Sequence, residues 1–217
     1  MTISFEPRRG YKRRVNVLLD GDYAFTANKR TLSQNDIKEG EQAKSLAALI
    51  EIIYEQELAS ALERSYYFLE TRMRSGKELR QNLAKAGFSQ EITDAAMEEL
   101  ERLGFLDDRA FSESWAQMKL QNKSVRMVAY ELKQKGISSE IIDEIKESAP
   151  RDDEEEKCLA VLTKYMRSRE FTRENLNKAA QACMRKGYDW EMVKSSLAKM
   201  KEGVDADGEG EGIDDEY

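Results

Sequence analysis

Apolar residues recur with helical spacing over most of the chain, and single glycines interrupt them. Leu79 and Leu83 lie one helical turn apart, and Gly87 follows, where a residue without Cβ can end a helix in the left-handed conformation. A second segment begins at Ser89, a typical N-cap residue, and ends at Gly104. Its apolar positions follow one stripe and are Ile92, Ala96, Leu100 and Leu103. The pattern predicts two short consecutive helices.

The same pattern occurs three times along the chain. The stretch around Gly87 aligns with those around Gly136 and Gly187, at intervals of 49 and 51 residues. A constant period of this length is typical of a tandem repeat array. A longer helical pattern precedes each copy: Leu58, Leu62, Tyr66, Leu69 and Met73 in the first, Phe111, Trp115 and Met118 in the second, and Leu159, Leu162 and Met166 in the third. Each repeat is therefore expected to contain three helices.

Three phrases of the sequence resemble the RecX family, the bacterial modulators of the RecA recombinase. They are Tyr-Phe-Leu-Glu-Thr-Arg-Met-Arg-Ser-Gly-Lys-Glu-Leu-Arg-Gln-Asn-Leu, Leu-Gly-Phe-Leu-Asp-Asp-Arg-Ala-Phe-Ser and Val-Ala-Tyr-Glu-Leu-Lys-Gln-Lys-Gly-Ile. The resemblance covers residues 57–200 and is most specific over 66–137. It implies an elongated, mainly α solenoid of three three-helix repeats that lies along a RecA–DNA filament and restrains its growth or activity.

The N-terminal part has a different pattern. Residues 1–14 carry five basic side chains and one acid, as in a nucleic-acid-binding arm or a solubilising end. Asp20-Gly21 joins two runs rich in β-forming residues and predicts a β-hairpin with a type I′ turn. Because an isolated hairpin is marginal in water, it should pack on the helical segment between Ala43 and Arg74, which is either one bent helix or two.

Five segments are therefore expected. They are an N-terminal module of basic arm, hairpin and helix (1–56), three repeats (57–104, 105–149 and 150–202) and an acidic tail (203–217). The tail has seven acids and no base, a composition that favours disorder. Without the tail the net charge of −7 becomes 0. The tail could compete with DNA or the filament for the basic segments of the fold, or it could only add solubility.

Charge differs between the second and third helices of the repeats. Residues 72–86 carry a net charge of +4 and residues 89–103 carry −4, while 119–135 and 138–149 carry +4 and −3. In the third repeat, residues 164–186 carry +5. If the repeats stack in one sense, their middle helices form a basic ridge suited to a regularly spaced polyanion or an acidic filament. The alternative is that oppositely charged helices complement one another and stay solvated.

The candidate contact residues combine dense positive charge with the family resemblance. They are Arg72, Arg74, Lys77 and Arg80 in the first repeat and Lys119, Lys123 and Arg126 in the second. The first four are expected to converge around the corner at Ser75 and Gly76. Cations at a helix C-terminus oppose its dipole, which explains Arg72 and Arg74, whereas a cation that opens a helix, as Lys77 does, needs another benefit.

Combinations of residues that support catalysis or metal binding are scarce. The chain has no histidine, so Cys158 and Cys183 lack the partner of a Cys/His nucleophile pair or a Cys/His zinc set and should pack in the third repeat. The pair Asp107-Asp108 is expected to start a helix and not to act as paired catalytic carboxylates. Among the aromatic residues, Tyr66, Trp115 and Tyr130 are expected in the core, and Tyr67 on the surface.

The resemblance thus implies a non-enzymatic, monomeric regulator of a RecA filament, without cofactor or metal and with single- or double-stranded DNA as a further contact. No segment has the roughly 20 apolar residues of a membrane span. The basic N-terminus lacks the apolar region of a signal peptide, so we expect a cytoplasmic protein without membrane contacts. The main alternative is a helix-turn-helix-like DNA-binding protein without a recombinase partner, and a generic helical scaffold is a third hypothesis.

Overall fold

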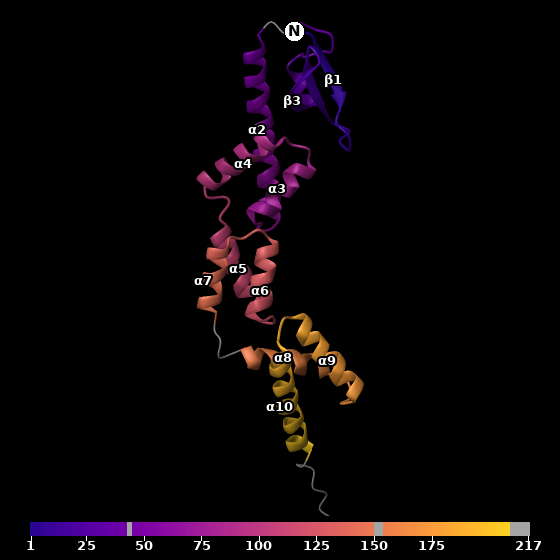
Figure 1. Cartoon of the computed structure of the whole chain (residues 1–217), viewed down its shortest axis with the longest axis vertical. Coiled ribbons are helices and arrows are strands. Elements are labelled where there is room, and N and C mark those ends of the chain that lie inside the picture. The colour runs from indigo at the N-terminus through magenta and orange to yellow at the C-terminus, as the bar shows by residue number, and fades with distance from the viewer. Residues whose placement is uncertain (43–44, 150–153, 209–217) are drawn as a thin grey trace, which may run out of the picture. The chain divides into compact units, whose positions relative to one another are not determined.

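The computed structural model describes residues 1–42, 45–149 and 154–208, except for the side chains of Leu46 and of residues 203–208. The chain forms two compact units, residues 1–111 and 112–217. The described part contains ten helices and a three-stranded antiparallel sheet near the N-terminus (Figure 1). This confirms the predicted class, tandem three-helix units that follow a small β-containing module.

The sheet has the order β1-β2-β3, with β1 at Ile3–Pro7, β2 at Arg14–Leu19 and β3 at Asp22–Asn28. Asp20 and Gly21 both have positive φ, 51° and 93°, as the two central residues of a type I′ turn require, which confirms the predicted hairpin. Strand β1 was not predicted. It pairs with β2 from Ile3 opposite Leu19 to Pro7 opposite Val15, so five residues of the predicted basic arm form a strand.

The sheet packs on α1 (Lys29–Gln34) and on α2 (Leu46–Thr71). The buried residues of this core are Ile3, Val15, Val17, Leu19, Ala27, Leu32, Ile37 and Ile53. Helix α2 is a single helix of 26 residues, which decides between the two predicted forms. It runs through residues 56 and 57, where we expected a domain boundary, so the N-terminal module and the first repeat share it.

The first repeat is completed by α3 (Gly76–Lys85) and α4 (Gln90–Arg102). Gly87 and Gly104 follow these helices with φ of 88° and 74°, and the Ser89 side chain accepts a hydrogen bond from the Ile92 backbone, all as predicted. Leu103, which we expected on the buried stripe, is 43% exposed. It is the C-cap residue of α4, and Met97 packs in the core instead.

The remaining helices are α5 (Asp108–Lys119), α6 (Val125–Gln134), α7 (Ser139–Ser148), α8 (Glu154–Met166), α9 (Arg173–Arg185) and α10 (Trp190–Gly208). The Asp107 carboxylate accepts the backbone N–H groups of Arg109 and Ala110 at 2.8 and 2.9 Å, which confirms its predicted role as a helix start. Helix α10 extends six residues into the predicted tail, which is wrong to that extent. Residues 209–217 of that tail lie outside the described residues.

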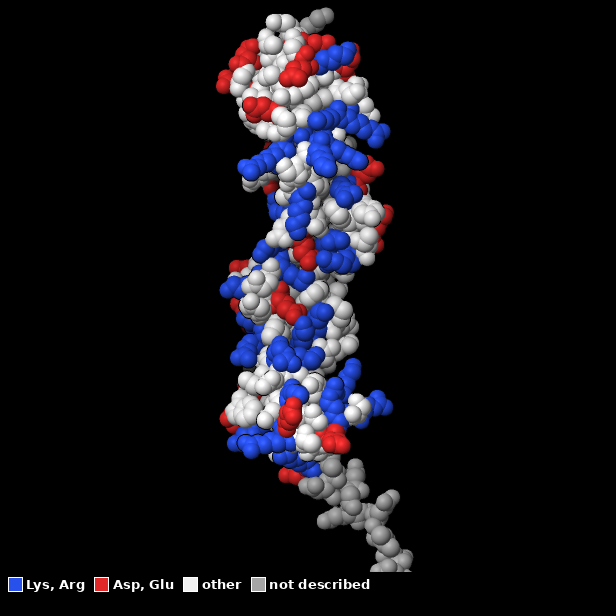
Figure 2. Space-filling model, turned by 90° about the vertical axis from the view of Figure 1, so that its right-hand side faces the viewer, with Lys and Arg blue, Asp and Glu red and all other residues white. Residues whose placement is uncertain are grey.

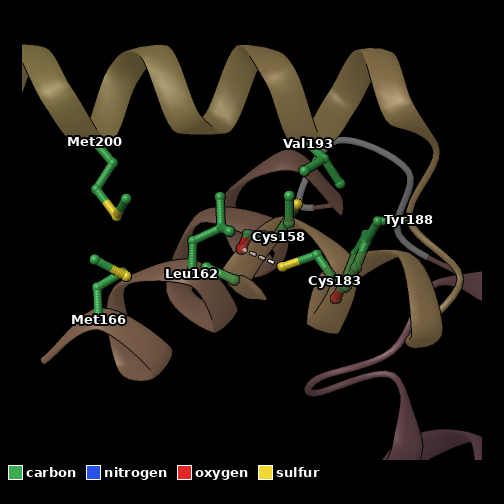
Figure 3. Close-up of a cluster of buried hydrophobic side chains, with 9 residues drawn as sticks. Cys158, Leu162, Met166, Cys183, Tyr188, Val193 and Met200 are labelled. Carbon is green, nitrogen blue, oxygen red and sulfur yellow. Dashed lines mark hydrogen bonds between the residues drawn. The ribbon is translucent and has the colours of Figure 1, made fainter. Parts of the chain in front are cut away.

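The third repeat has its own core between α8, α9 and α10 (Figure 3). Cys158 and Cys183 are free thiols with no solvent exposure, as predicted, and Cys183 Sγ lies 3.9 Å from the Cys158 carbonyl oxygen, to which it donates. Hydrogen bonding to the Cys158 thiol, together with burial, raises the pKa of Cys183. A thiol that stays protonated is a poor nucleophile, so this sulfur acts as a packing group.

Candidate functional site

Arg72 lies at the corner between α2 and α3. Its guanidinium donates to both carboxylate oxygens of Glu78, at 3.1 and 3.3 Å, while half of its side chain stays exposed. Glu78 also closes a capping box with Ser75 at the start of α3. The acid therefore holds Arg72 at the N-terminus of α3 and offsets the unfavourable position of a cation there.

The other candidates of the first repeat point to different partners. Arg74 Nε donates to the Phe68 carbonyl oxygen at 2.9 Å, so Arg74 satisfies the C-terminal end of α2, as the dipole argument predicts. Arg80 pairs with Asp94 of α4, and both side chains are about half exposed, 47% and 49%. Lys77 is exposed on the first turn of α3. These residues lie near one another in sequence but do not converge on a single point at Ser75 and Gly76.

In the second repeat, two of the three predicted cations, Lys119 and Lys123, lie near Trp115 together with Lys135, which was not predicted. Lys119 and Lys135 place their ammonium groups 4.6 and 4.0 Å from the centre of the Trp115 ring. Lys123 pairs with Glu131, whose other oxygen accepts the Trp115 indole N–H at 3.2 Å. A half-buried aromatic ring thus holds three lysines on one patch through cation–π and ion-pair contacts.

Arg126 joins two repeats. Its guanidinium donates to the Gly187 carbonyl oxygen at 3.0 Å, and the Ser124 backbone N–H donates to the Lys186 carbonyl oxygen at the same distance. Gly187 has a φ of 94°, and a Cβ placed on it would meet Ser124 Oγ and lie 2.6 Å from Met127 Cβ. Only glycine allows this approach, so Arg126 has a structural role in addition to any contact with a partner.

The N-terminal module uses the same kind of contact on α3. Arg8 donates to the Gly87 carbonyl oxygen at 2.6 Å, and Arg14 Nε donates to that of Ala86 at 3.1 Å. Arg14 is buried, pairs with Glu57 at 2.5 Å and lies 4.0 Å from the centre of the Phe88 ring. Two of the five basic residues of the predicted arm therefore attach the module to the first repeat. The other three, Arg9, Lys12 and Arg13, are exposed.

Comparison with known proteins shows which family this arrangement of helices resembles. The model of the first three-helix domain of RecX matches residues 61–100, and that of the second three-helix domain matches residues 107–145. Over these two ranges the chain is similar to the RecX family. The matched ranges include α3 and α6, most of α4 and α7, and all seven candidate cations, while the third repeat lies outside both ranges.

Full-length relatives extend the RecX match over most of the chain. The regulatory protein RecX of Clostridium botulinum (strain Eklund 17B / Type B) is 26% identical over 193 residues, which cover 87% of this chain and 91% of that protein. That of Bacillus velezensis is 28% identical over 204 residues, covering 92% and 77%. A crystal structure of a regulatory protein RecX aligns with a TM-score of 0.57 at 23% identity, covering 89% and 98%, and shows the same fold. Both full-length relatives are regulatory proteins.

Further cations of the repeats were missed as candidates. Lys85, Lys133 and Arg185 are exposed near the C-terminal ends of α3, α6 and α9, and none has a hydrogen bond or ion pair with another described residue. In each unit taken alone, Lys and Arg side chains gather on the face drawn in Figure 2. The signal that could have found these residues is their position two or three places before the repeated glycine.

Aromatic exposure also differs from expectation. Tyr130 is 59% exposed, so its predicted core position is wrong, whereas Tyr67 is 57% exposed as predicted. Tyr130 lies on a hollow of about 740 Å³ between α6 and α7, which Arg126 and Lys133 also line. In the first unit, Met73 and Phe105, both at least half exposed, line a more apolar hollow of about 700 Å³.

Two further properties limit the chemistry of this surface. The described residues contain no group of three or more Cys, Asp or Glu side chains placed to hold a metal ion. Within the same part of the chain, no helix combines the length and apolarity needed to cross a membrane. Among the described residues, Lys and Arg side chains recur at corresponding places in the repeats. Their positive charge suits binding of an anionic partner.

Proposed function

We propose that this protein binds a filament of the RecA recombinase through the basic ridge of its repeats and inhibits the ATPase and recombinase activities of that filament. The observation that carries the proposal is similarity to a family of regulatory proteins over helices that bear the repeated cations. The binding needs no catalytic step and no cofactor. Its consequence in the cell would be a restraint on DNA repair, recombination and the response to DNA damage.

The proposed contacts fall into two groups according to their partners in the structure. Arg72 and Arg80 keep about half of their side chains exposed although each has an acidic partner. They, the exposed Lys77, and Lys119 and Lys123 beside Trp115 are proposed to touch the filament directly. Arg74 and Arg126 donate to backbone carbonyl groups, so we propose that they hold the contact surface in shape.

The strength of such a surface comes from number and regularity. An exposed ion pair contributes only about 0.2–1 kcal/mol, so one cation decides little. Three basic segments, with net charges of +4, +4 and +5, can together bind a repeating anionic surface at low salt. Binding should weaken steeply as salt is raised, because these charges are exposed and are screened beyond about 8–10 Å.

The test measures DNA-dependent ATP hydrolysis and strand exchange by the cognate recombinase while this protein is titrated. Both activities should fall at less than one copy per recombinase protomer, because an array of three repeats would contact several protomers. The variant Lys77→Glu with Arg80→Glu should inhibit less, and its control is Arg9→Glu with Lys12→Glu, which reverses the same number of exposed charges outside the repeats. Unchanged activities at saturating protein would overturn the proposal.

DNA binding without a recombinase is the competing outcome. A mobility-shift assay with single- and double-stranded DNA, in the presence and absence of the recombinase, separates the two. Tight DNA binding by this protein alone would favour the helix-turn-helix-like alternative. Association only in the presence of the recombinase favours filament binding.

A further inference from the structure

The turn between α8 and α9 carries a cluster of cations that belongs to the third basic segment but includes none of the seven candidate contact residues. We name the α8–α9 corner by its residues Lys164, Arg167, Arg169, Phe171 and Arg173. All five side chains are exposed, and Phe171 is 44% exposed. Glu170 is the acid within this stretch, so its net charge is +3. The corner therefore combines excess positive charge with an accessible aromatic ring.

Only one of these cations is explained by the fold. Arg169 donates to the Tyr165 carbonyl oxygen and lies 4.2 Å from the centre of the Tyr165 ring, so it caps the C-terminus of α8. Lys164, Arg167 and Arg173 make no hydrogen bond or ion pair with another described residue. Lys164 and Arg167 are three residues apart on α8 and so share one helix face.

The backbone of the corner is held in place before any partner binds. Thr172 N–H donates to the Glu170 carbonyl oxygen at 2.8 Å, and the Asn175 side-chain amide donates to the same oxygen at 3.0 Å. Thr172 also caps α9 by accepting the Asn175 backbone N–H at 3.3 Å. Fixed backbone geometry lowers the entropy cost of binding a flexible anionic segment.

Helix α10 contacts the end of α8 at which this corner begins. Met200 of α10 packs with Met166 at the C-terminal end of α8, whereas Val193 lies near Cys158 toward the other end of α8 (Figure 3). Met200 therefore marks the place where α10 passes the C-terminal end of α8. Gly208 follows Met200 by eight residues, which is about 12 Å along a helix.

The segment that follows has the matching chemistry. Residues 209–217 include five acids, Glu209, Glu211, Asp214, Asp215 and Glu216, together with Ile213 and Tyr217 and no base. Nine residues span up to about 30 Å when extended, more than twice the distance from Met200 to Gly208. The α8–α9 corner lies within that reach, and an apolar residue between acids fits a phenylalanine between cations.

We propose that residues 209–217 dock on the α8–α9 corner of the same chain, with their carboxylates on Arg167 and Arg173 and an apolar side chain on Phe171. The docked segment covers part of the third copy of the basic ridge, so an anionic partner must displace it. The short connection gives the segment an effective concentration in the millimolar range, enough for weak ion pairs to hold it at low salt. This docking goes beyond filament binding and does not depend on it.

The test is carbodiimide cross-linking of the dilute full-length protein, which joins a carboxylate to a lysine amine only when the two are in contact. Mass spectrometry of the monomer should find residues 209–217 linked to Lys164. Lys201, which lies on α10 near the segment in sequence, gives an internal reference for links that need no docking. Arg167→Glu with Arg173→Glu should lower the ratio of Lys164 to Lys201 links about fivefold or more, because both docking cations are lost.

The matched control is Lys133→Glu with Arg185→Glu, which reverses two exposed cations of the same unit away from the corner. This control should leave the ratio unchanged. The proposal is overturned if no Lys164 link forms, if both double variants give the same ratio, or if the link occurs only in cross-linked dimers. No recombinase is present in the assay, so its outcome is independent of the proposed function.

Discussion

The buried pair of Arg14 and Glu57 makes a sharp prediction about how the N-terminal module is attached. The two side chains are 6% and 2% exposed and lie 2.5 Å apart. Glu57 also accepts the Asn28 backbone N–H at 2.8 Å and the Thr31 hydroxyl at 3.2 Å. Arg14→Met removes the cation and leaves a buried carboxylate with two neutral donors, a loss that costs about 3–5 kcal/mol in buried ion pairs.

The assay is urea unfolding followed by circular dichroism, with hydrogen exchange to locate the change. Exchange should rise over β2 and β3, where the backbone pairing depends on this contact. Both tryptophans of the chain, Trp115 and Trp190, lie in the second unit, so their fluorescence should report an unchanged transition there. The control Arg13→Met removes an exposed cation next to Arg14 and should change the free energy of unfolding by no more than about 0.5 kcal/mol.

A second variant separates the loss of the pair from the burial of an unpaired charge. Arg14→Met with Glu57→Gln has no buried charge and keeps an amide oxygen that can accept from Asn28 and Thr31. It should recover most of the lost stability, since replacement of a buried ion pair by neutral groups is often close to neutral. A cost below about 1 kcal/mol for Arg14→Met alone, or a double variant less stable than that single one, would refute the reasoning.

Three other predictions test the repeats. Gly187→Ala should destabilise the second unit by about 1–3 kcal/mol, measured by the tryptophan transition in urea, because its Cβ would collide with Ser124 and its φ is 94°. Gly104→Ala, which has a positive φ but open space around it, is the control, and because it lies in the first unit its urea transition is followed by circular dichroism. Lys77→Glu with Arg80→Glu should weaken filament binding about tenfold, or 1.4 kcal/mol, with the loss shrinking at high salt, and normal binding at low salt would exclude these contacts. The same variant should melt at a slightly lower temperature, because Arg80→Glu places a second acid beside Asp94. Small-angle scattering should give a radius of gyration above the roughly 17 Å of a compact globule of this length, and a smaller value would refute the predicted solenoid.

Local signals in the sequence predicted the parts of the fold that depend on a few adjacent residues. Asp20-Gly21 identified the hairpin because positive φ at both positions suits few other residue pairs. Gly87 and Gly187 identified helix ends for the same reason. Ser89 and Asp107 were identifiable as helix starts because a short polar side chain can accept the unpaired N–H groups of the first turn.

The parts that the sequence did not reveal depend on partners far along the chain. Strand β1 is stabilised by its register with β2, and the basic residues near it favoured the interpretation as an arm. Arg14 finds Glu57 43 residues later, so nothing adjacent to it marks it as a core residue. Arg126 was selected for its charge, but its partner is the Gly187 carbonyl oxygen, 61 residues away.

The contacts of Arg8 with Gly87 and of Arg126 with Gly187 have one physical cause, and this cause changes how the basic ridge should be interpreted. The last carbonyl groups of a helix are unsatisfied and carry the negative end of its dipole, so they attract arginine. Arg8 donates to the Gly87 carbonyl and Arg126 to that of Gly187, and in each case the missing Cβ makes room for neighbouring residues of the same segment, Tyr11 and Arg14 at Gly87 and Ser124 and Met127 at Gly187. Some arginines of this array therefore hold it together, and net charge alone does not identify its binding surface. Exposed cations without a partner in the structure are the better guide, because binding them to an anion breaks no existing contact.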